Sequence, residues 1–375
     1  MKVLQLGKAY PPANLGGVEI VIQLLTEGLN DHGIVCDALG VNDIPVYKIE
    51  EYKQGKIYRA KLLKKKFSTL LSFQLPSLLK KITNQYDIIT IHSPDPMACL
   101  ALWLVKPKCK VVLYWHSDIL KQKLLLTFYN PLLNWLLKRA DKIIATSPNY
   151  INGSKYLSKH FSKCEVIPIG IDHPQKVENI NNEYKRFEHL KNRKVIFSLG
   201  RLAYYKGYEF LVKSAKEISD DAVILIAGAG EENDKLVNII DENSLHEKVF
   251  LLGKISEEEK EFLFRNAKIF ALSSIYKTEA YAIVQVEALS YGLPIISTKI
   301  PGSGVDWVNK DKETGIIVPI RDSLSISKAI NSLLNDEELY KKYSENAYNR
   351  YSENFTKDKM IEKINDRKLN IIERP

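Results

Sequence analysis

The sequence predicts an α/β protein made of two doubly wound domains, and three observations support this prediction. Short apolar strand candidates alternate with amphipathic helical stretches along the whole chain, which is typical of parallel sheets covered by helices. The chain has 375 residues, more than the size at which one hydrophobic core usually keeps growing. A polar stretch without strand character, residues 173–192, separates two halves of similar rhythm. We therefore expect domains over 1–172 and 193–354, joined by a linker.

The N-terminal half begins with a strand candidate, "KVLQLG" at 2–7, and an amphipathic helix that ends at Gly33. Further strands are expected at 86–93, 110–117, 142–147 and 164–170, with a helical stretch at 128–141 between the second and third of them. This alternation indicates a parallel sheet with helices on both faces.

The C-terminal half repeats the pattern. Strands are expected at 194–200, 222–230, 248–255, 268–274, 293–298 and 315–320, and helices at 208–218 and 257–267. The last segment, 355–375, contains a charged amphipathic helix that we expect to pack back on the N-terminal domain. Because doubly wound sheets bind ligands at the carboxyl ends of their strands, loops of both domains should face one cleft.

The net charge of +9 is unevenly distributed. Residues 1–175 hold 23 basic and 13 acidic residues, a net +10, whereas residues 176–375 are close to neutral. A basic N-terminal half is compatible with an anionic lipid surface, an anionic acceptor, nucleic acid, or simply a solvated basic surface. No recognisable nucleic-acid-binding motif is present, so we expect no nucleic-acid partner.

Hydropathy and cysteine usage indicate a cytoplasmic protein. No run approaches the ~18 apolar residues that span a membrane, and the N-terminus lacks the pattern of a secretion signal. Four scattered cysteines, without paired or metal-like spacing, suit a reducing compartment. Segments 56–81 and 120–139 mix lysine and arginine with leucine and aromatic residues, as interfacial segments do. Core-packing helices with basic outer sides account for them equally well.

Two features of the N-terminal half are candidates for ligand binding. Gly16 and Gly17 precede the first helix, where glycines allow close approach to a ligand and the helix N-terminus favours an anion. A structural turn explains them equally well. His116 ends an apolar strand in the cluster "HSD", and His92 ends another strand in the same manner as a weaker candidate.

The C-terminal half carries cations and carboxylates at the ends of its strands. In "SLGRLAYYKG", Arg201 and Lys206 lie in a strand-to-helix loop, where two cations can clamp a diphosphate. In "TEAYAIVQVE", Glu279 precedes a helix that starts near Ala282, and Glu287 lies eight residues after Glu279. Eight helical residues span roughly 12 Å, comparable to a sugar–diphosphate–ribose ligand. One carboxylate could then bind hexose hydroxyls and the other ribose hydroxyls, with phosphate at the helix N–H groups between them.

Taken together, "LGGVE", "WHSD", "GRLAYYKG" and the E-x7-E motif "EAYAIVQVE" resemble the retaining GT-B glycosyltransferases of family GT4. The resemblance covers nearly the whole chain. It implies a GT-B architecture, with an acceptor-binding and a nucleotide-sugar-binding Rossmann-like domain facing a cleft. The stretches "KTEAYAIVQVEAL" and "IPGSGVDWV" are especially similar to bacterial enzymes of O-antigen and capsule assembly, several of which are mannosyltransferases that use GDP-mannose.

The resemblance also implies a role for each candidate residue. His116 would contact the donor hexose near the reacting carbon, and Gly16 and Gly17 would line the diphosphate and acceptor side. Arg201 and Lys206 would bind the diphosphate. The remaining donor-binding residues implied are Glu279 at the sugar, Glu287 at the ribose, Ala282 and Ile283 at phosphate, and Leu252 to Ile255 near the base. The family commonly has Phe-Gly where this chain has Tyr281-Ala282, which adds a methyl group where backbone meets ligand.

The resemblance implies transfer of a hexose with retention, from a nucleoside-diphosphate sugar to a lipid-linked or growing glycan at the inner membrane face. No D-x-D motif or His/Asp cluster with ligand spacing is present in the sequence, so we expect no metal and no other cofactor. The same transfer from a UDP-sugar, and a non-catalytic nucleotide-sugar-binding protein of the same fold, remain alternatives.

Overall fold

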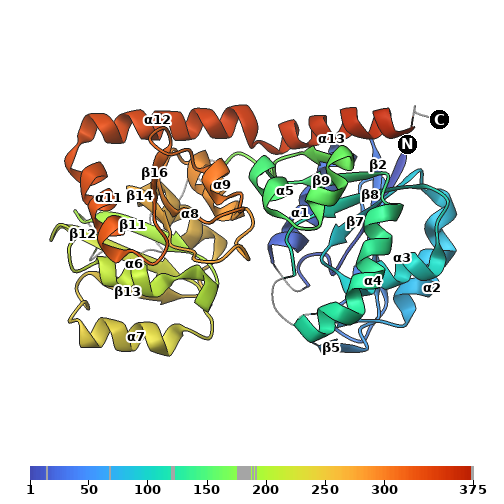
Figure 1. Cartoon of the computed structure of the whole chain (residues 1–375), viewed down its shortest axis with the longest axis horizontal. Coiled ribbons are helices and arrows are strands. Elements are labelled where there is room, and N and C mark those ends of the chain that lie inside the picture. The colour runs from blue at the N-terminus through green and yellow to red at the C-terminus, as the bar shows by residue number, and fades with distance from the viewer. Residues whose placement is uncertain are drawn as a thin grey trace. The chain divides into compact units, whose positions relative to one another are not determined.

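The computed structural model of the chain describes residues 1–13, 16–66, 69–119, 123–174, 187, 190 and 192–372, and of 123–125 and 367–372 it describes the backbone only. The chain divides into two units (Figure 1). The first contains Met1–Gly170 together with the C-terminal segment from Lys357, and the second contains Ile171–Thr356. Most of the linker expected at 173–192 lies outside the described residues.

The first unit is built on an eight-stranded sheet in the order β10-β9-β8-β7-β1-β2-β4-β3. Its strands are β1 (Lys2–Leu6), β2 (Val35–Val41), β3 (Lys48–Tyr52), β4 (Gly55–Ala60), β7 (Ile88–Ser93), β8 (Lys110–Trp115), β9 (Lys142–Ala145) and β10 (Cys164–Val166). All neighbours pair in parallel except β3, which pairs with β4 as an antiparallel edge. Strands β5 (Lys64–Lys66) and β6 (Thr69–Leu71) form a separate antiparallel pair.

The helices of the first unit are α1 (Gly17–Asp31), α2 (Gln74–Ile82), α3 (Pro96–Val105), α4 (Lys123–Arg139), α5 (Pro148–Gly153) and α13 (Lys357–Ile372), with 3-10 turns η1 (Thr83–Gln85) and η2 (Leu157–Lys163). The start of α3 is determined by two neighbouring residues. The Asp95 side chain accepts hydrogen bonds from the first free amides of the helix, and Pro96 occupies its first position, where no amide hydrogen is needed. Helix α13 packs on α1, where a side chain at Gly28 would lie 2.7 Å from Ile361. The C-terminal helix is therefore part of the first unit.

The second unit contains a six-stranded, fully parallel sheet in the order β13-β12-β11-β14-β15-β16. The strands are β11 (Lys194–Leu199), β12 (Ala222–Ala227), β13 (Val249–Gly253), β14 (Ile269–Leu272), β15 (Ile295–Thr298) and β16 (Gly315–Val318). Its helices are α6 (Tyr208–Ser214), α7 (Asn233–Glu242), α8 (Glu257–Asn266), α9 (Ile283–Ser290), α10 (Val305–Val308), α11 (Ser323–Asn335) and α12 (Glu337–Asn354), with the 3-10 turn η4 (Tyr204–Lys206).

In each sheet the chain first adds strands on one side of the unit's first strand and later adds them on the other side. In the first unit the chain proceeds from β1 to β2 on one side and returns to β7 on the other. In the second unit it proceeds from β11 to β12 on one side and returns to β14 on the other. Ligands of doubly wound folds bind at such switch points, outside the carboxyl ends of the strands. The predicted α/β class with two doubly wound sheets is confirmed, and the switch points indicate where sites are to be sought.

Candidate active site

In the second unit, the loops that follow β11 and β14 are joined at the switch point. The Ser273 hydroxyl donates to the Lys206 carbonyl oxygen over 3.0 Å, and the Ile275 amide donates to the Tyr205 carbonyl over 2.8 Å. Gly207 has φ +62°, and a Cβ there would lie 2.3 Å from the Ser273 carbonyl oxygen. Only glycine satisfies both conditions, so Gly207 allows the two loops to approach and fixes Lys206 between them.

Lys206, expected at the diphosphate, and Glu279, expected at the donor sugar, form a buried ion pair. Lys206 Nζ lies 2.5 Å from Glu279 Oε2, and both side chains are about nine-tenths buried. The Ser274 hydroxyl donates to the same carboxylate oxygen over 2.8 Å. Burial alone would lower the pKa of Lys206, but the adjacent carboxylate outweighs it and raises the pKa above its ordinary value. The structure therefore holds a cation and a carboxylate side by side at the switch point.

Arg201 follows β11 and is exposed, in contrast to Lys206. Within the described ranges, no ion pair or hydrogen bond of its guanidinium is recorded. A planar guanidinium can bind two oxygens of one phosphate or carboxylate. Arg201 is therefore available to bind an anion next to the buried pair.

The start of α9 supplies backbone donors. Ala282 is its N-cap, and the first hydrogen bond from the new helix is the Gln285 amide to the Ala282 carbonyl, 2.9 Å. The amides of Ile283 and Val284 have no recorded partner in the part of the chain that the structure describes. Free amides at a helix N-terminus favour an anion. Ala282 has φ +61° and ψ +79°, in the left-handed region that favours glycine, which costs an L-residue about 1 kcal/mol.

Glu287 lies further along α9 and pairs with a neighbouring helix. Its Oε1 is 3.2 Å from Lys260 Nζ on α8, and Lys260 is also 2.5 Å from Glu257. Burial would lower the pKa of Lys260, but the two carboxylates, Glu287 first, raise it. Leu252 and Ile255 are half-buried on either side of the turn between β13 and α8. Thus α8 lies beside the part of α9 that carries Glu287.

In the first unit, His116 is the outer member of a chain of three side chains. Its Nε2 lies 2.9 Å from Nδ1 of His92, and Nε2 of His92 lies 2.9 Å from Oε1 of Gln5. Burial, and secondarily the charge of Lys8, lowers the pKa of His116 from 6.5 to about 3. His116 is consequently a neutral imidazole at any physiological pH. The weaker candidate, His92, is its direct partner.

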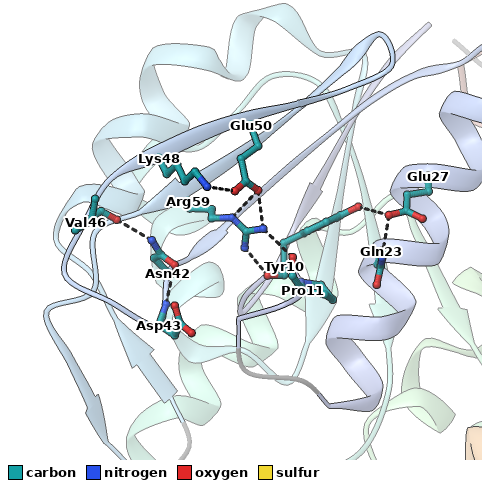
Figure 2. A network of polar contacts seen from close by, with 10 residues as sticks. All are labelled: Tyr10, Pro11, Gln23, Glu27, Asn42, Asp43, Val46, Lys48, Glu50 and Arg59. Carbon is teal, nitrogen blue, oxygen red and sulfur yellow. Dashed lines mark hydrogen bonds and ion pairs between the residues drawn. The ribbon is translucent and has the colours of Figure 1, made fainter. Parts of the chain in front are cut away.

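The loop after β1 is held by a polar network that the sequence did not reveal (Figure 2). The buried guanidinium of Arg59 on β4 donates to the carbonyl oxygens of Tyr10 and Pro11 and pairs with Glu50. The Tyr10 hydroxyl donates to Glu27 on α1 over 3.0 Å, and Figure 2 shows the Tyr10 side chain reaching from the loop to that helix. Arg59 therefore fixes this loop from the sheet side and Glu27 from the helix side.

The two glycines at the start of α1 differ in what they provide. Gly16 is the N-cap with an extended backbone, φ −161°, which any residue can adopt. A Cβ there would lie 2.8 Å from the Glu19 carboxylate, so glycine leaves room for that side chain. Gly17 is the first residue of the helix and is exposed.

The described residues contain no group of three or more histidine, cysteine, aspartate or glutamate side chains placed to hold a metal ion.

Comparison with known proteins connects this geometry with an enzyme family. Residues 15–175 match the family described as "Glycosyltransferase Family 4", and residues 179–350 match "Glycosyl transferases group 1". The O-antigen chain mannosyltransferase C of Escherichia coli is 31% identical over 365 residues, which cover 96% of each chain. The chain belongs to glycosyltransferase family 4. The D-rhamnosyltransferase WbpZ of Pseudomonas aeruginosa is 28% identical to this glycosyltransferase, over 95% of this chain and 92% of WbpZ.

Solved structures confirm the GT-B fold of this glycosyltransferase. Sucrose-phosphate synthase from Thermosynechococcus elongatus has a TM-score of 0.78 at 19% identity, covering 99% of each chain. HepE from Anabaena, solved in complex with UDP-glucose, has a TM-score of 0.76 at 17% identity and covers 99% of this chain and 100% of its own.

Proposed function

We propose that this glycosyltransferase moves a hexose from a nucleoside-diphosphate sugar to a lipid-linked or growing glycan acceptor in cell-surface polysaccharide synthesis. The observation that carries the proposal is the buried Lys206–Glu279 pair, which lies beside the exposed Arg201 at the switch point of the second sheet. A nucleoside-diphosphate sugar presents an anion next to a polyol. A cation next to a carboxylate that accepts hydroxyl hydrogen bonds matches that chemistry.

In the proposed mechanism, the bond between the anomeric carbon and the diphosphate oxygen breaks, and negative charge develops on the diphosphate. Arg201, Lys206 and the amides that begin α9 stabilise this charge from fixed positions. Such preorganised electrostatic stabilisation is usually the largest single contribution to an enzyme's rate enhancement. The acceptor hydroxyl attacks from the face that the leaving group vacates, so the anomeric configuration is retained. Its proton passes to an oxygen of the departing phosphate. Glu279 orients the hexose through its hydroxyls, and Glu287 binds the ribose.

We further propose GDP-mannose as the donor. The support is the full-length similarity to an O-antigen chain mannosyltransferase, whereas a UDP-sugar is the alternative donor. Purified protein offered GDP-mannose and a panel of UDP-sugars should show thermal stabilisation and slow release of the nucleoside diphosphate with GDP-mannose. Glu279→Gln should abolish the release while the thermal shift with GDP alone persists. A response to UDP-sugars and none to GDP-mannose would replace the donor. Binding without turnover of any sugar would favour the non-catalytic alternative.

The first unit has an exposed apolar and basic surface that supports a proposal of peripheral membrane attachment. Helix α3 packs against α2 and α4, and β6 also contacts α3. Among the described residues, the exposed large apolar side chains on or beside these elements are Leu63, Phe73, Leu100, Trp103, Leu104 and Phe128. Lys64–Lys66 on β5 are also exposed. No helix among the described residues is long and apolar enough to cross a bilayer. Apolar side chains flanked by lysines are typical of segments that bind an anionic lipid surface.

A flotation assay tests this attachment. Vesicles containing an anionic phospholipid should carry the protein upward at low salt, and less of it at high salt because charge is screened. Phe73→Ser with Phe128→Ser should reduce flotation. Phe161→Ser is the matched control, since Phe161 is 64% exposed on η2, outside this surface. An equal loss in the control, or no flotation at low salt, would reject the proposal.

A further inference from the structure

A chain of hydrogen bonds runs from the middle of the first sheet to the residue that follows β8. Gln5 lies on β1 and His92 on the adjacent strand β7, at the switch point, while His116 follows β8. Gln5 and His92 are fully buried, whereas His116 is 9% exposed. The inner members are fixed by the sheet, and only the outer member reaches the surface.

The two contacts of His92 determine which ring nitrogens carry protons. The amide oxygen of Gln5 can only accept, so Nε2 of His92, 2.9 Å away, must donate. In a neutral His92 the other nitrogen, Nδ1, is then unprotonated and accepts from Nε2 of His116. The amide nitrogen of Gln5 faces the Cys36 sulfur at 3.5 Å, which leaves the amide oxygen toward His92. Nδ1 of His116 is consequently a hydrogen-bond acceptor.

The rings are also held in orientation. Tyr114 stacks on His116 with centroids 4.8 Å apart and on His92 at 5.4 Å, with interplanar angles below 20°. No hydrogen bond to Nδ1 of His116 comes from any residue that the structure describes, so among the ring nitrogens of His92 and His116 this one is left for a ligand. The lowered pKa keeps the ring neutral, so the acceptor lone pair is retained down to acidic pH.

We propose that Gln5 and His92 are positioning residues that fix His116 in its Nε2-protonated tautomer, so that its Nδ1 accepts a hydrogen bond from a sugar hydroxyl group. The inference rests on the proposed sugar transfer. The unprotonated Nδ1 of His116 attracts a hydroxyl group and repels a phosphate oxygen, because a phosphate oxygen also only accepts hydrogen bonds. This tautomer therefore assigns His116 to a sugar and excludes it from the diphosphate, for which a protonated histidine would be the natural partner.

The tautomer itself is measured without substrate. Nitrogen-15 NMR of the histidine-labelled full-length protein should show His116 protonated at Nε2 and unprotonated at Nδ1, with the signal assigned by its loss in His116→Asn. Gln5→Met keeps the size of the side chain and removes the acceptor, so the single tautomer should become a mixture. Gln5→Glu keeps an acceptor oxygen and should preserve the tautomer. A wild-type His116 protonated at Nδ1, or an unchanged tautomer in Gln5→Met, would overturn the inference.

Kinetics then identify the hydroxyl. Gln5→Met should lower kcat/KM about tenfold, the value of one neutral hydrogen bond, and Gln5→Glu should restore most of it. If kcat/KM for the donor falls, and this fall disappears with a donor analogue that lacks one hydroxyl group, then that hydroxyl group lies on the transferred hexose. A loss that follows the acceptor places it on the acceptor glycan. A loss that is equal for every deoxy analogue contradicts the inference. Absence of turnover with any donor would refute the proposed function and leave the NMR result standing.

Discussion

Replacing Lys206 by methionine should destabilise the protein by about 3–5 kcal/mol, because Glu279 then remains buried without its cation. The magnitude follows from the geometry: the pair is 2.5 Å apart and each side chain is about nine-tenths buried, so water cannot take over the role of the lysine. Glu279→Gln should cost less, because the amide oxygen that it leaves can still accept hydrogen bonds from the Lys206 ammonium group and the Ser274 hydroxyl. The double variant removes both charges and should recover about 2 kcal/mol relative to Lys206→Met.

Urea unfolding of the three variants measures this coupling in a double-mutant cycle. Lys254→Met is the matched control, since Lys254 is exposed in the same unit and should change the unfolding free energy by no more than about 0.5 kcal/mol. Separate unfolding transitions of the two units should be fitted individually. The reasoning is refuted if Lys206→Met costs no more than the control, or if the double variant loses the sum of the two single losses.

Three further predictions concern other parts of the two sites. Since the folded protein resists protonation of His116 and the unfolded chain does not, acidification favours unfolding between pH 6.5 and about 3. Wild type should therefore lose about 2 kcal/mol more than His116→Asn between about pH 7.5 and pH 5, as measured by urea unfolding, and equal losses would reject the buried neutral ring. Ala282→Gly should stabilise the protein by about 1 kcal/mol in thermal unfolding, because glycine adopts φ +61° without strain; a destabilised variant would argue against that backbone. Lys260→Met should raise the donor KM severalfold with little change in kcat, because Glu287 then loses the cation that holds its carboxylate in place for the ribose. Lys260→Arg keeps a cation at this position and should retain the wild-type KM. A fall in kcat alone would contradict this role.

Much of the fold could be predicted because strand and helix patterns are local. The C-terminal helix at 357–372 and all six strands of the second unit follow from apolar runs and their flanking residues. The pattern predicts no strand at the positions of β2, β3, β4, β5 and β6. β3 is an antiparallel edge strand with mostly exposed or half-buried residues, which lacks the apolar run that marks a buried strand.

The candidate residues could be placed on loops, but their partners could not be predicted from spacing. Lys206 and Glu279 are 73 positions apart and meet because β11 and β14 are neighbours in the sheet. Gln5 carries no motif and becomes relevant only because its strand lies beside the strand of His92. Arg59 was counted as part of a basic segment, although its charge is used inside the fold to hold the loop after β1. Sequence identifies the residue types, and strand order determines which of them meet.

The central claim is that the residues around Lys206 and Glu279 bind and activate a nucleoside-diphosphate hexose. Its most direct test is release of the nucleoside diphosphate from GDP-mannose by the wild type and by Glu279→Gln, at saturating donor. We predict measurable release by the wild type, exceeding that from any UDP-sugar, and a loss of at least about 100-fold in the variant, the size seen when one preorganised polar group is removed from an active site. Equal rates in the two proteins would contradict the account.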